Sequence, residues 1–415
     1  MKKTLILTLA ICFSITHGIF AQQAVQLITT DIDHFWNAYD KIVSTTDTAA
    51  QYGYLNQLFI EKATPGQLAM IKARNYTPKQ YLEVIHSKQS YFNSIRKNTL
   101  KAKDYASATA KKTERFKQIY PALRPAKIYF TVGAFRSGGT TKGNMVLIGS
   151  EIAMADEHLA DLVATNVHEY VHTQQKSTMG ENLLAQSVME GVAEFVAEQV
   201  MGKSNPLPAF SYGKAHADTV RRVFGTQMFS SGTGFWLYSD AENQFGVRDL
   251  GYYVGYAIAQ AYHQKATNKI QAVKEMIELD ILDSTALEAY VDKSGYFADS
   301  VKLLKAAYEN NRPQVISAVP LKTGTLDGLT TFSFTVNFSK PMDTRFRSFE
   351  LGPLGEGNLM RVKTFKGFAA DGKSAELVVA IKPGNHYQLV IGDGFRDQNG
   401  LRLKPYLIDF KPLDE

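Results

Sequence analysis

The spacing of hydrophobic residues changes along the chain and predicts where helices and strands lie. From Thr29 to about Ala122, apolar residues recur every three or four positions, which is the period of amphipathic helices that pack on a core. One of these helices opens with Thr77 and Pro78, because a threonine followed by proline is a favoured helix start. The apolar positions that define the other helices are Phe35, Trp36, Tyr39 and Ile42, then Tyr52, Leu55, Leu58 and Phe59, and then Tyr91, Phe92 and Ile95.

The period shortens to two between Lys127 and Ile152. The runs KIYFTVGAF and NMVLIGSEI have the composition of β-strands, and the segment RSGGTTKG joins them. Gly138 and Gly139 mark a turn in this segment, since adjacent glycines interrupt regular structure. The pattern predicts two short strands linked by a turn.

Helical spacing returns after Glu157 and continues to about Asn311. Residues 157–179 contain neither proline nor glycine, and residues 181–201 form a second, strongly apolar run. The remainder consists of a loop-rich part at 202–246 with one basic helix around Lys214–Val223, and helices at 248–263, 269–279, 285–291 and 299–308.

Beyond Arg312 and Pro313 the chain consists of short alternating runs. VISAVP, LTTFSFTVNF, SAELVVAI and HYQLVIG are separated by Gly, Pro, Asp and Asn turns, and about 100 residues with such spacing predict a small β-sandwich. The expected fold class is therefore α+β. A mainly helical domain with a small β-sheet covers residues 22–312, divided into a helical part at 22–125 and a core at 126–312, and an all-β sandwich covers residues 313–415.

The first residues have the pattern of a secretory signal peptide, residues 1–21. Two lysines precede an apolar core from Leu5 to about Phe20, and a cleavage site follows Ala21. Lipid attachment at Cys12 fits less well, because Ile11 before it is bulky. Cleavage after Ala21 would remove the only cysteine, so the mature chain would contain no disulfide and would be secreted or periplasmic.

The segment VATNVHEYVHTQQ, residues 163–175, holds the strongest candidate chemistry. His168 and His172 are four residues apart, so on a helix both imidazoles lie on one face and can bind a single metal ion. Glu169 lies beside them and can hold a water molecule and accept its proton, as a hydrolytic zinc site requires. Two surface histidines on an amphipathic helix are the alternative interpretation.

A catalytic zinc usually has three protein ligands, and the next predicted helix offers carboxylates. Glu190, Glu194 and Glu198 recur every four residues among apolar neighbours, and like charges at this spacing indicate a cationic partner. We assign Glu190 as the third ligand, Glu194 as the acceptor that orients a ligand histidine, and Glu198 as part of a solvated helix face. Gly191 would let this helix approach the histidine-bearing helix closely.

The sequence HEYVHTQQ followed by EGVAEFVAE resembles the gluzincin metallopeptidases, most closely the predicted zinc-dependent proteases in which H-E-x-x-H is followed by E-G-x-A. The resemblance implies a zincin-like fold, one zinc ion per chain bound by His168, His172 and Glu190, and Glu169 as general base. Seventeen residues separate His172 from Glu190, slightly fewer than in the best-known gluzincins, and Glu194 stands where an aspartate is common. In zincins an exposed edge strand pairs with the substrate backbone, and the two predicted strands fit this arrangement as well as they fit an ordinary hairpin.

Zinc peptidases also need a donor for the oxyanion that forms when water adds to the carbonyl. In RDLGYYVGYAIAQAYH, residues 248–263, Gly251, Gly255 and Ala259 recur every four residues and give a smooth face for helix packing. GYYVGY also recurs in the predicted-protease families, and we choose Tyr253 as the donor. The alternatives are Tyr256, Arg248 and His263, and a structural role fits each of these side chains equally well.

Together these features predict a zinc metallopeptidase that acts on peptide or protein substrates. The net charge of +6 is spread over the chain without a basic block, so no nucleic-acid partner is expected. VNFSKPMD and GDGFRDQNG resemble bacterial Ig-like domains, which implies a module for attachment to a cell surface or outside the cell. Two alternatives remain: a zinc hydrolase of a non-peptide or cell-wall amide, and a non-catalytic surface-binding protein with a structural zinc, which would normally have a fourth protein ligand.

Overall fold

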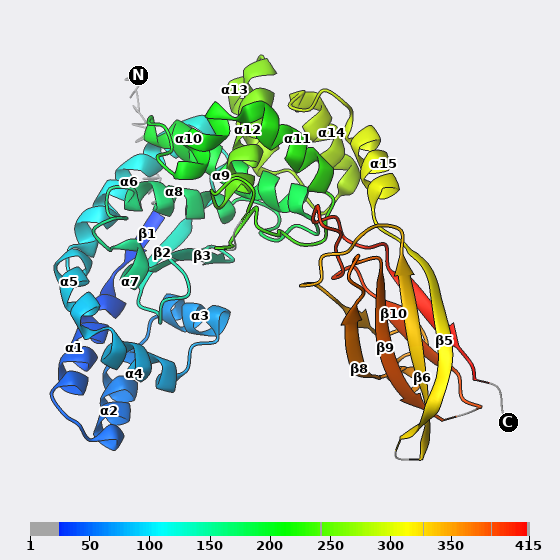
Figure 1. Ribbon diagram of the computed structural model, residues 1–415. Coiled ribbons are helices and arrows are strands. Elements are labelled where there is room, and N and C mark those ends of the chain that lie inside the picture. The colour runs from blue at the N-terminus through cyan, green and yellow to red at the C-terminus, as the bar shows by residue number, and fades with distance from the viewer. Residues whose placement is uncertain (1–24, 241–242, 327, 383, 413–415) are drawn as a thin grey trace, which may run out of the picture. The chain divides into compact units, whose positions relative to one another are not determined.

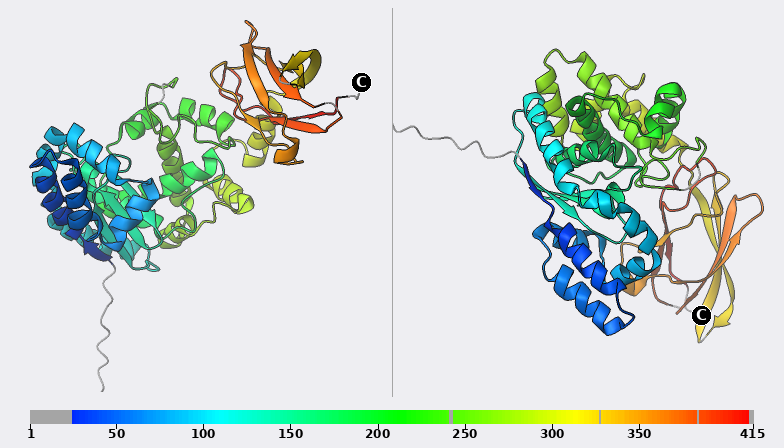
Figure 2. Two further views of the ribbon diagram at one scale, coloured as in Figure 1. Left: turned by 90° about the horizontal axis from the view of Figure 1, so that it is seen from below. Right: turned by 90° about the vertical axis from the view of Figure 1, so that its left-hand side faces the viewer.

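A computed structural model describes residues 25–240, 243–326, 328–382 and 384–412. The expected signal peptide, residues 1–21, and Cys12 lie outside the described residues. The predicted α+β class is confirmed, because helices dominate as far as Asn311 and antiparallel sheets follow (Figures 1 and 2). Contacts divide the chain into two compact units, residues 1–173 and 174–415, which are described in turn. Within the described residues, no helix combines the length and the apolar character needed to cross a membrane.

The first unit is built around a four-stranded sheet in the order β1-β2-β4-β3. Strands β1, β2 and β4 are parallel to one another, and β3 pairs antiparallel with β4 and forms one edge. Strands β2 and β4 are buried along nearly their whole length, and helices of this unit pack against both strands. The elements are β1 (Val25–Ile28), α1 (Thr30–Val43), α2 (Thr48–Leu55), the π-helical turn η1 (Asn56–Ile60), α3 (Pro65–Arg74), α4 (Pro78–Ser87), α5 (Gln89–Thr99), α6 (Ala102–Ile119), β2 (Ala126–Thr131), β3 (Gly139–Lys142), β4 (Met145–Gly149), α7 (Ser150–Ala153) and α8 (Leu162–His172).

The connection between the two predicted strands differs from the expectation. We expected a turn at Gly138 and Gly139, but Gly139 begins strand β3, and the tight turn lies at Gly143 and Asn144. Gly143 has a φ of 59°, which glycine adopts without a Cβ clash and which two-residue hairpin turns require. The expected pair of strands is therefore a parallel pair, β2 and β4, with the edge strand β3 folded back on β4.

The predicted helices of the first unit pack around an aromatic core. Phe35, Trp36 and Tyr39 of α1 are buried against Phe92 of α5, with ring centroids 5.3–6.4 Å apart. The start of α4 has the expected cap. The Thr77 hydroxyl accepts a hydrogen bond from the Gln80 backbone N–H, and the Gln80 side chain accepts one from the Thr77 backbone N–H. Local capping and the helical period thus explain this layer.

Helix α8 bears both histidines on one face and is anchored by hydrogen bonds from its opposite face. Tyr170 is fully buried and donates a hydrogen bond of 2.9 Å to the backbone oxygen of Arg124. The Asn166 amide donates to Thr109 of α6 at 2.9 Å. These contacts fix the rotation of α8 and therefore the direction in which its histidine face points.

In the described part of the second unit seven helices come first, and α9 and α12 pack most closely. Gly191 of α9 faces the backbone of Gly255 and Tyr256 of α12, and a Cβ at position 191 would lie 2.0 Å from the Gly255 carbonyl carbon. The neighbour that requires glycine at 191 is therefore α12, and the small-residue face predicted for residues 248–263 is the matching surface. The helices are α9 (Leu183–Met201), α10 (Pro208–Ala215), α11 (Ala217–Gln227), α12 (Leu250–Lys265), α13 (Lys269–Ile277), α14 (Ser284–Ser294) and α15 (Val301–Asn311).

The C-terminal part of the second unit is sandwich-like. Two sheets, in the orders β5-β6-β9-β8 and β11-β10-β7, share one hydrophobic core that includes Phe334, Leu377, Ile391 and Leu403. Pairs of antiparallel strands bury alternate residues, as the period of two predicts. The strands are β5 (Val315–Leu326), β6 (Leu329–Phe338), β7 (Phe349–Glu350), β8 (Val362–Phe368), β9 (Ser374–Ile381), β10 (Tyr387–Ile391) and β11 (Tyr406–Phe410), with a 3₁₀ turn, η2 (Glu356–Asn358).

Candidate metal centre

The two histidines of α8 converge on one point. Their rings are nearly perpendicular, with centroids 4.6 Å apart, and the two Nε2 atoms are 2.9 Å apart. Both side chains are buried, with exposed fractions of 9% for His168 and 7% for His172. Two nitrogens bound to one tetrahedral zinc ion are about 3.3 Å apart, so a shift of a few tenths of an ångström brings this pair to the required separation.

Glu190 of α9 completes a group of three candidate ligands. Its side chain is buried, and the ligand atoms of His168, His172 and Glu190 all lie within 4.8 Å of one another. Two imidazoles and one carboxylate are a donor set that catalytic zinc uses, with a coordination position left for water or substrate. The residues present therefore fit a zinc ion.

A tyrosine from the segment between α11 and α12 contacts the Glu190 carboxylate. The Tyr238 hydroxyl donates a hydrogen bond to Glu190 and accepts one of 2.7 Å from the Gln186 amide. Burial, and after it the negative charge of Glu190, raise the pKa of the Tyr238 hydroxyl well above its ordinary value. The hydroxyl is therefore a protonated donor throughout the neutral pH range.

The backbone at Tyr238 has an unusual conformation. Tyr238 has a φ of 61° and Asp249 a φ of 62°, in the left-handed region that side chains larger than glycine rarely occupy. The Tyr238 backbone N–H donates to the Asp249 carboxylate at 2.8 Å, which holds this conformation in place. Although the residue is 53% exposed, its hydroxyl end reaches the buried carboxylate. Strain of this kind persists where surrounding contacts over-determine it, as at functional sites.

Glu169 contacts the first residue of the edge strand. A Cβ built on Gly139 would lie 2.6 Å from Oε1 of Glu169 and 3.0 Å from its carboxyl carbon. A methyl group at this point of β3 would therefore push the Glu169 side chain aside. The contact places the candidate base next to an edge strand whose residues are half-buried or exposed.

The two later glutamates of α9 have polar partners. Glu194 accepts a hydrogen bond from the Asn205 amide. Glu198 is half-buried and accepts from the Tyr256 hydroxyl at 2.7 Å and from the backbone of Asn205 at 3.2 Å. We expected Glu198 to belong to a solvated helix face, but it is half-buried and its carboxylate has two hydrogen-bond donors, so this face is only partly solvated.

The structure places the candidate oxyanion donors in different surroundings. The Tyr253 ring is buried over Gly213 of α10 and packs edge-on against Phe210, with centroids 6.2 Å apart. Burial raises the pKa of the Tyr253 hydroxyl, and the positive charge of Arg221 offsets part of this rise. Of the three alternatives, Tyr256 donates a hydrogen bond to Glu198. Arg248 forms ion pairs with Asp240 and Asp249 at the surface. The His263 ring packs on Phe195, and burial lowers the pKa of this histidine.

Two tyrosines close to Glu190 were not among the candidates chosen from the sequence. Tyr252 lies in the GYYVGY stretch, and burial followed by the charge of Glu190 raises the pKa of its hydroxyl. Tyr252 could have been chosen over Tyr253 only if the face of α12 that packs on α9 had been known. Tyr238 carries no such signal, because it comes from an irregular segment.

One comparison with known protein families finds a match. Residues 95–283 match a domain family described as "Predicted Zn-dependent protease (DUF2268)". This range contains all three candidate ligands, Glu169 and Tyr238. No match is found among the curated proteins. The family match and the buried group of two histidines and a glutamate together support a zinc protease family for this part of the chain.

Proposed function

We propose that the protein is a zinc-dependent metallopeptidase with one zinc ion per chain, held by His168, His172 and Glu190. The observation that carries the proposal is the buried group of three ligand atoms within 4.8 Å of one another. A buried carboxylate beside two imidazoles is stable when a cation compensates its charge. The family match supports the same activity.

Zinc, when bound, supplies a Lewis acid that polarises a carbonyl group and makes water more acidic. Glu169 is the residue we propose as general base. It accepts a proton from the attacking water and later passes that proton to the leaving amine. Its place directly after His168 on α8 and its contact with Gly139 position the carboxylate beside the edge strand.

The edge strand β3 is the part of the sheet that we propose as the substrate-binding strand. It pairs with β4 on one side only and is outermost in the sheet. A peptide that adds to this edge forms main-chain hydrogen bonds and passes close to Glu169. Such binding depends on the backbone of the substrate, which suits a peptidase that accepts varied side chains.

We propose that Tyr238, and not Tyr253, supplies the tyrosine hydroxyl that acts at the zinc site. Its hydrogen bond holds one oxygen of Glu190, which fixes the orientation of the ligand carboxylate. Tyr252 is a further hydroxyl beside the same carboxylate. The Tyr253 ring, in contrast, packs on Gly213 and Phe210 of α10, and the charge that acts on its hydroxyl is that of Arg221 of α11.

Export and attachment belong to the same proposal. The pattern of residues 1–21 supports a secreted or periplasmic enzyme, and the sandwich-like C-terminal part would attach it to a surface. N-terminal sequencing of protein recovered outside the cytoplasm tests this, with Gln22 as the expected first residue. An uncleaved chain retained in the cytoplasm would contradict it.

The first experiment is elemental analysis of the purified protein. We expect one zinc ion per chain in the wild type and little in Glu190→Gln. Glu198→Gln is the matched control, because this glutamate lies on the same helix and its partner Tyr256 can donate to an amide oxygen equally well. Equal zinc in Glu190→Gln and Glu198→Gln would show that Glu190 is not a ligand.

The second experiment measures hydrolysis of a fluorogenic peptide library. Glu169→Gln should retain zinc and lose at least about two orders of magnitude in rate, the usual contribution of a general base. Full activity in a zinc-loaded Glu169→Gln protein would refute the assigned role. Release of products from peptidoglycan but from no peptide would favour a cell-wall amide as substrate.

A further inference from the structure

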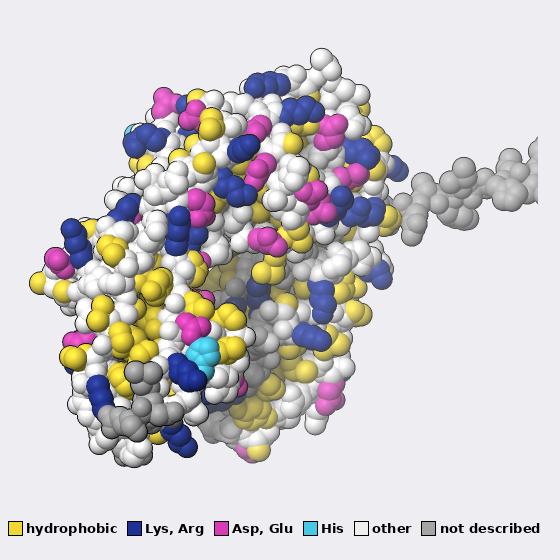
Figure 3. All heavy atoms as spheres, turned by 90° about the vertical axis from the view of Figure 1, so that its right-hand side faces the viewer, with side chains coloured by type: hydrophobic (Ala, Val, Ile, Leu, Met, Phe, Trp, Pro, Cys, Tyr) yellow, Lys and Arg dark blue, Asp and Glu magenta, His cyan; other side chains and the backbone are white. Residues whose placement is uncertain are grey.

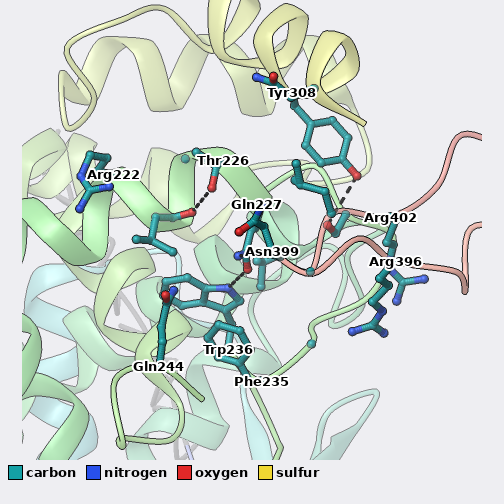
Figure 4. A pocket seen from close by; sticks show the side chains of 18 of the residues that line it. Arg222, Thr226, Gln227, Phe235, Trp236, Gln244, Tyr308, Arg396, Asn399 and Arg402 are labelled. Atoms are coloured by element: carbon teal, nitrogen blue, oxygen red, sulfur yellow. Dashed lines mark hydrogen bonds between the residues drawn. The ribbon is translucent and has the colours of Figure 1, made fainter. Parts of the chain in front are cut away.

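A second concave site lies in the second unit. It is lined by α11, α15, residues between 230 and 239, Asn243, Gln244 and loops of the sandwich-like part, and its cavity has a volume of about 1250 Å³ (Figures 3 and 4). None of the three candidate zinc ligands lines it. Small-molecule sites usually have volumes of about 300–1000 Å³. The size therefore favours a segment of a polymer over a metabolite.

The lining of this cavity is predominantly basic. Six of the lining residues are lysine or arginine and three are aspartate. Four of the six basic side chains form ion pairs with aspartates: Arg221 with Asp218, Arg345 with Asp343, Lys340 with Asp397 and Arg402 with Asp393. Arg222 and Arg396 form no ion pair with the described residues, against one such aspartate of the lining, Asp299, and this remaining positive charge favours an anionic ligand.

Two adjacent arginines from the sandwich loops form the core of the basic surface. The Arg396 guanidinium lies over the Phe346 ring, 4.5 Å from its centroid, and its buried Nε has no hydrogen-bond partner among the described residues. Arg402 reaches Asp393 at 3.2 Å, and Figure 4 shows the side chains of Arg396 and Arg402 next to each other. Burial, followed by repulsion from Arg402, lowers the pKa of Arg396. A carboxylate would satisfy the guanidinium and offset this repulsion.

Apolar and amide side chains surround the arginines. Phe235, Phe297 and Phe346 are half-buried and line the same cavity, so they can receive apolar side chains of a ligand. Gln244 and Gln398 are exposed, and neither side chain forms a hydrogen bond with the part of the chain that the structure describes. Their amides match the donors and acceptors of a peptide backbone.

The same lining argues against an acidic polysaccharide. A sugar ring stacks on the open face of a large aromatic ring, and the cavity contains Trp236 and Tyr308. Their exposed fractions are only 1% and 4%, so neither offers such a face. The Trp236 indole N–H donates a hydrogen bond of 2.8 Å to the Gln227 side chain (Figure 4).

We propose that this cavity is a docking site for an acidic peptide segment of a partner protein. A carboxylate of the segment lies between Arg396 and Arg402, and its apolar side chains contact the half-buried phenylalanines. The site is separate from the zinc group, and its function does not depend on hydrolysis there.

The proposal is tested by fluorescence anisotropy with a labelled peptide of alternating glutamate and phenylalanine. The protein is the full-length Glu169→Gln variant, so that hydrolysis cannot consume the peptide. We expect saturable binding that weakens with salt, and an affinity at least about tenfold lower for the analogue with glutamine in place of glutamate. Arg396→Gln should weaken binding of the acidic peptide by a similar factor.

Arg361→Gln is the matched control. Arg361 is an exposed arginine of the same sandwich-like part, paired with Glu356 at 3.0 Å and absent from the cavity lining. Equal affinities of Arg396→Gln and Arg361→Gln, or no binding to the starting protein, would overturn the proposal. If Arg396→Gln fails to fold, the exposed Arg222 of the lining replaces it, with the same expectation in direction. Binding of polygalacturonate without binding of the acidic peptide would also overturn it.

Discussion

Replacing Gly255 by alanine is expected to force α9 and α12 apart. A Cβ at position 255 would lie 1.7 Å from the backbone oxygen of Ser187 and 3.0 Å from the Cα of Gly191. Ordinary van der Waals contact begins at 3.4 Å, so the helices would have to separate by roughly 1.7 Å at this point. Both contacted atoms belong to the backbone, so no side chain can turn aside to make room.

The expected loss in the free energy of unfolding is about 3 kcal/mol. Extra methyl groups in packed cores cost about 1–3 kcal/mol, and a clash with backbone lies at the upper end of this range. Separation of the helices also weakens contacts between the facing atoms, because dispersion energy falls steeply over the first ångström of a gap. Since Glu190 precedes Gly191 on α9, zinc affinity should fall as well.

Urea unfolding of the full-length protein measures the loss. Gly53→Ala is the control, because Gly53 is also helical but nothing lies within 4 Å of the added Cβ. This control should gain about 0.5–1 kcal/mol, since alanine is the better helix former. A Gly255→Ala protein within about 0.5 kcal/mol of the wild type would refute the close contact of the two helices.

Three further predictions concern pH, capping and the edge strand. Burial raises the pKa of the Glu151 carboxyl to about 7 from its ordinary 4.5, so its favourable contribution to folding is complete below pH 4.5 and is lost as the pH rises through 7. The unfolding free energy of the wild type should therefore fall by about 3 kcal/mol relative to that of Glu151→Gln between about pH 4 and about pH 8, as measured by urea unfolding. The same difference between the two proteins at both pH values would contradict the raised pKa. Thr77→Ala should lower the unfolding free energy by about 1 kcal/mol through loss of the α4 cap, with urea unfolding as the measurement. Gly139→Ala should lower the peptidase rate and leave the zinc content unchanged, because the new methyl group displaces Glu169; equal rates would show that the carboxylate tolerates the shift.

The features that sequence reasoning predicted correctly depend on residues close together in the chain. The α4 cap needs only Thr77, Pro78 and a glutamine in the first turn. The convergence of His168 and His172 needs only four-residue spacing on a helix. The change from helices to strands after Asn311 follows from the change in hydrophobic period.

The pairing of the strands in the first unit could not be read in the same way. Val25 of β1 pairs with Ala126 of β2, far along the chain, and β2 and β4 are parallel although a short segment joins them. A run of β-forming residues indicates a strand, but its partner depends on which faces helices cover. The turn at Gly143 was missed because two earlier glycines gave the stronger local signal.

The sequence alone determined the helical character of the first part, the sandwich-like C-terminal part and the candidate histidine pair, because each is encoded in short-range periodicity or spacing. Tertiary structure decided that Gly191 faces α12, that Glu198 accepts a hydrogen bond from Tyr256, and that the Tyr238 hydroxyl reaches Glu190. These contacts join segments distant in the chain. They arise from close packing between elements, which no local pattern of residues specifies.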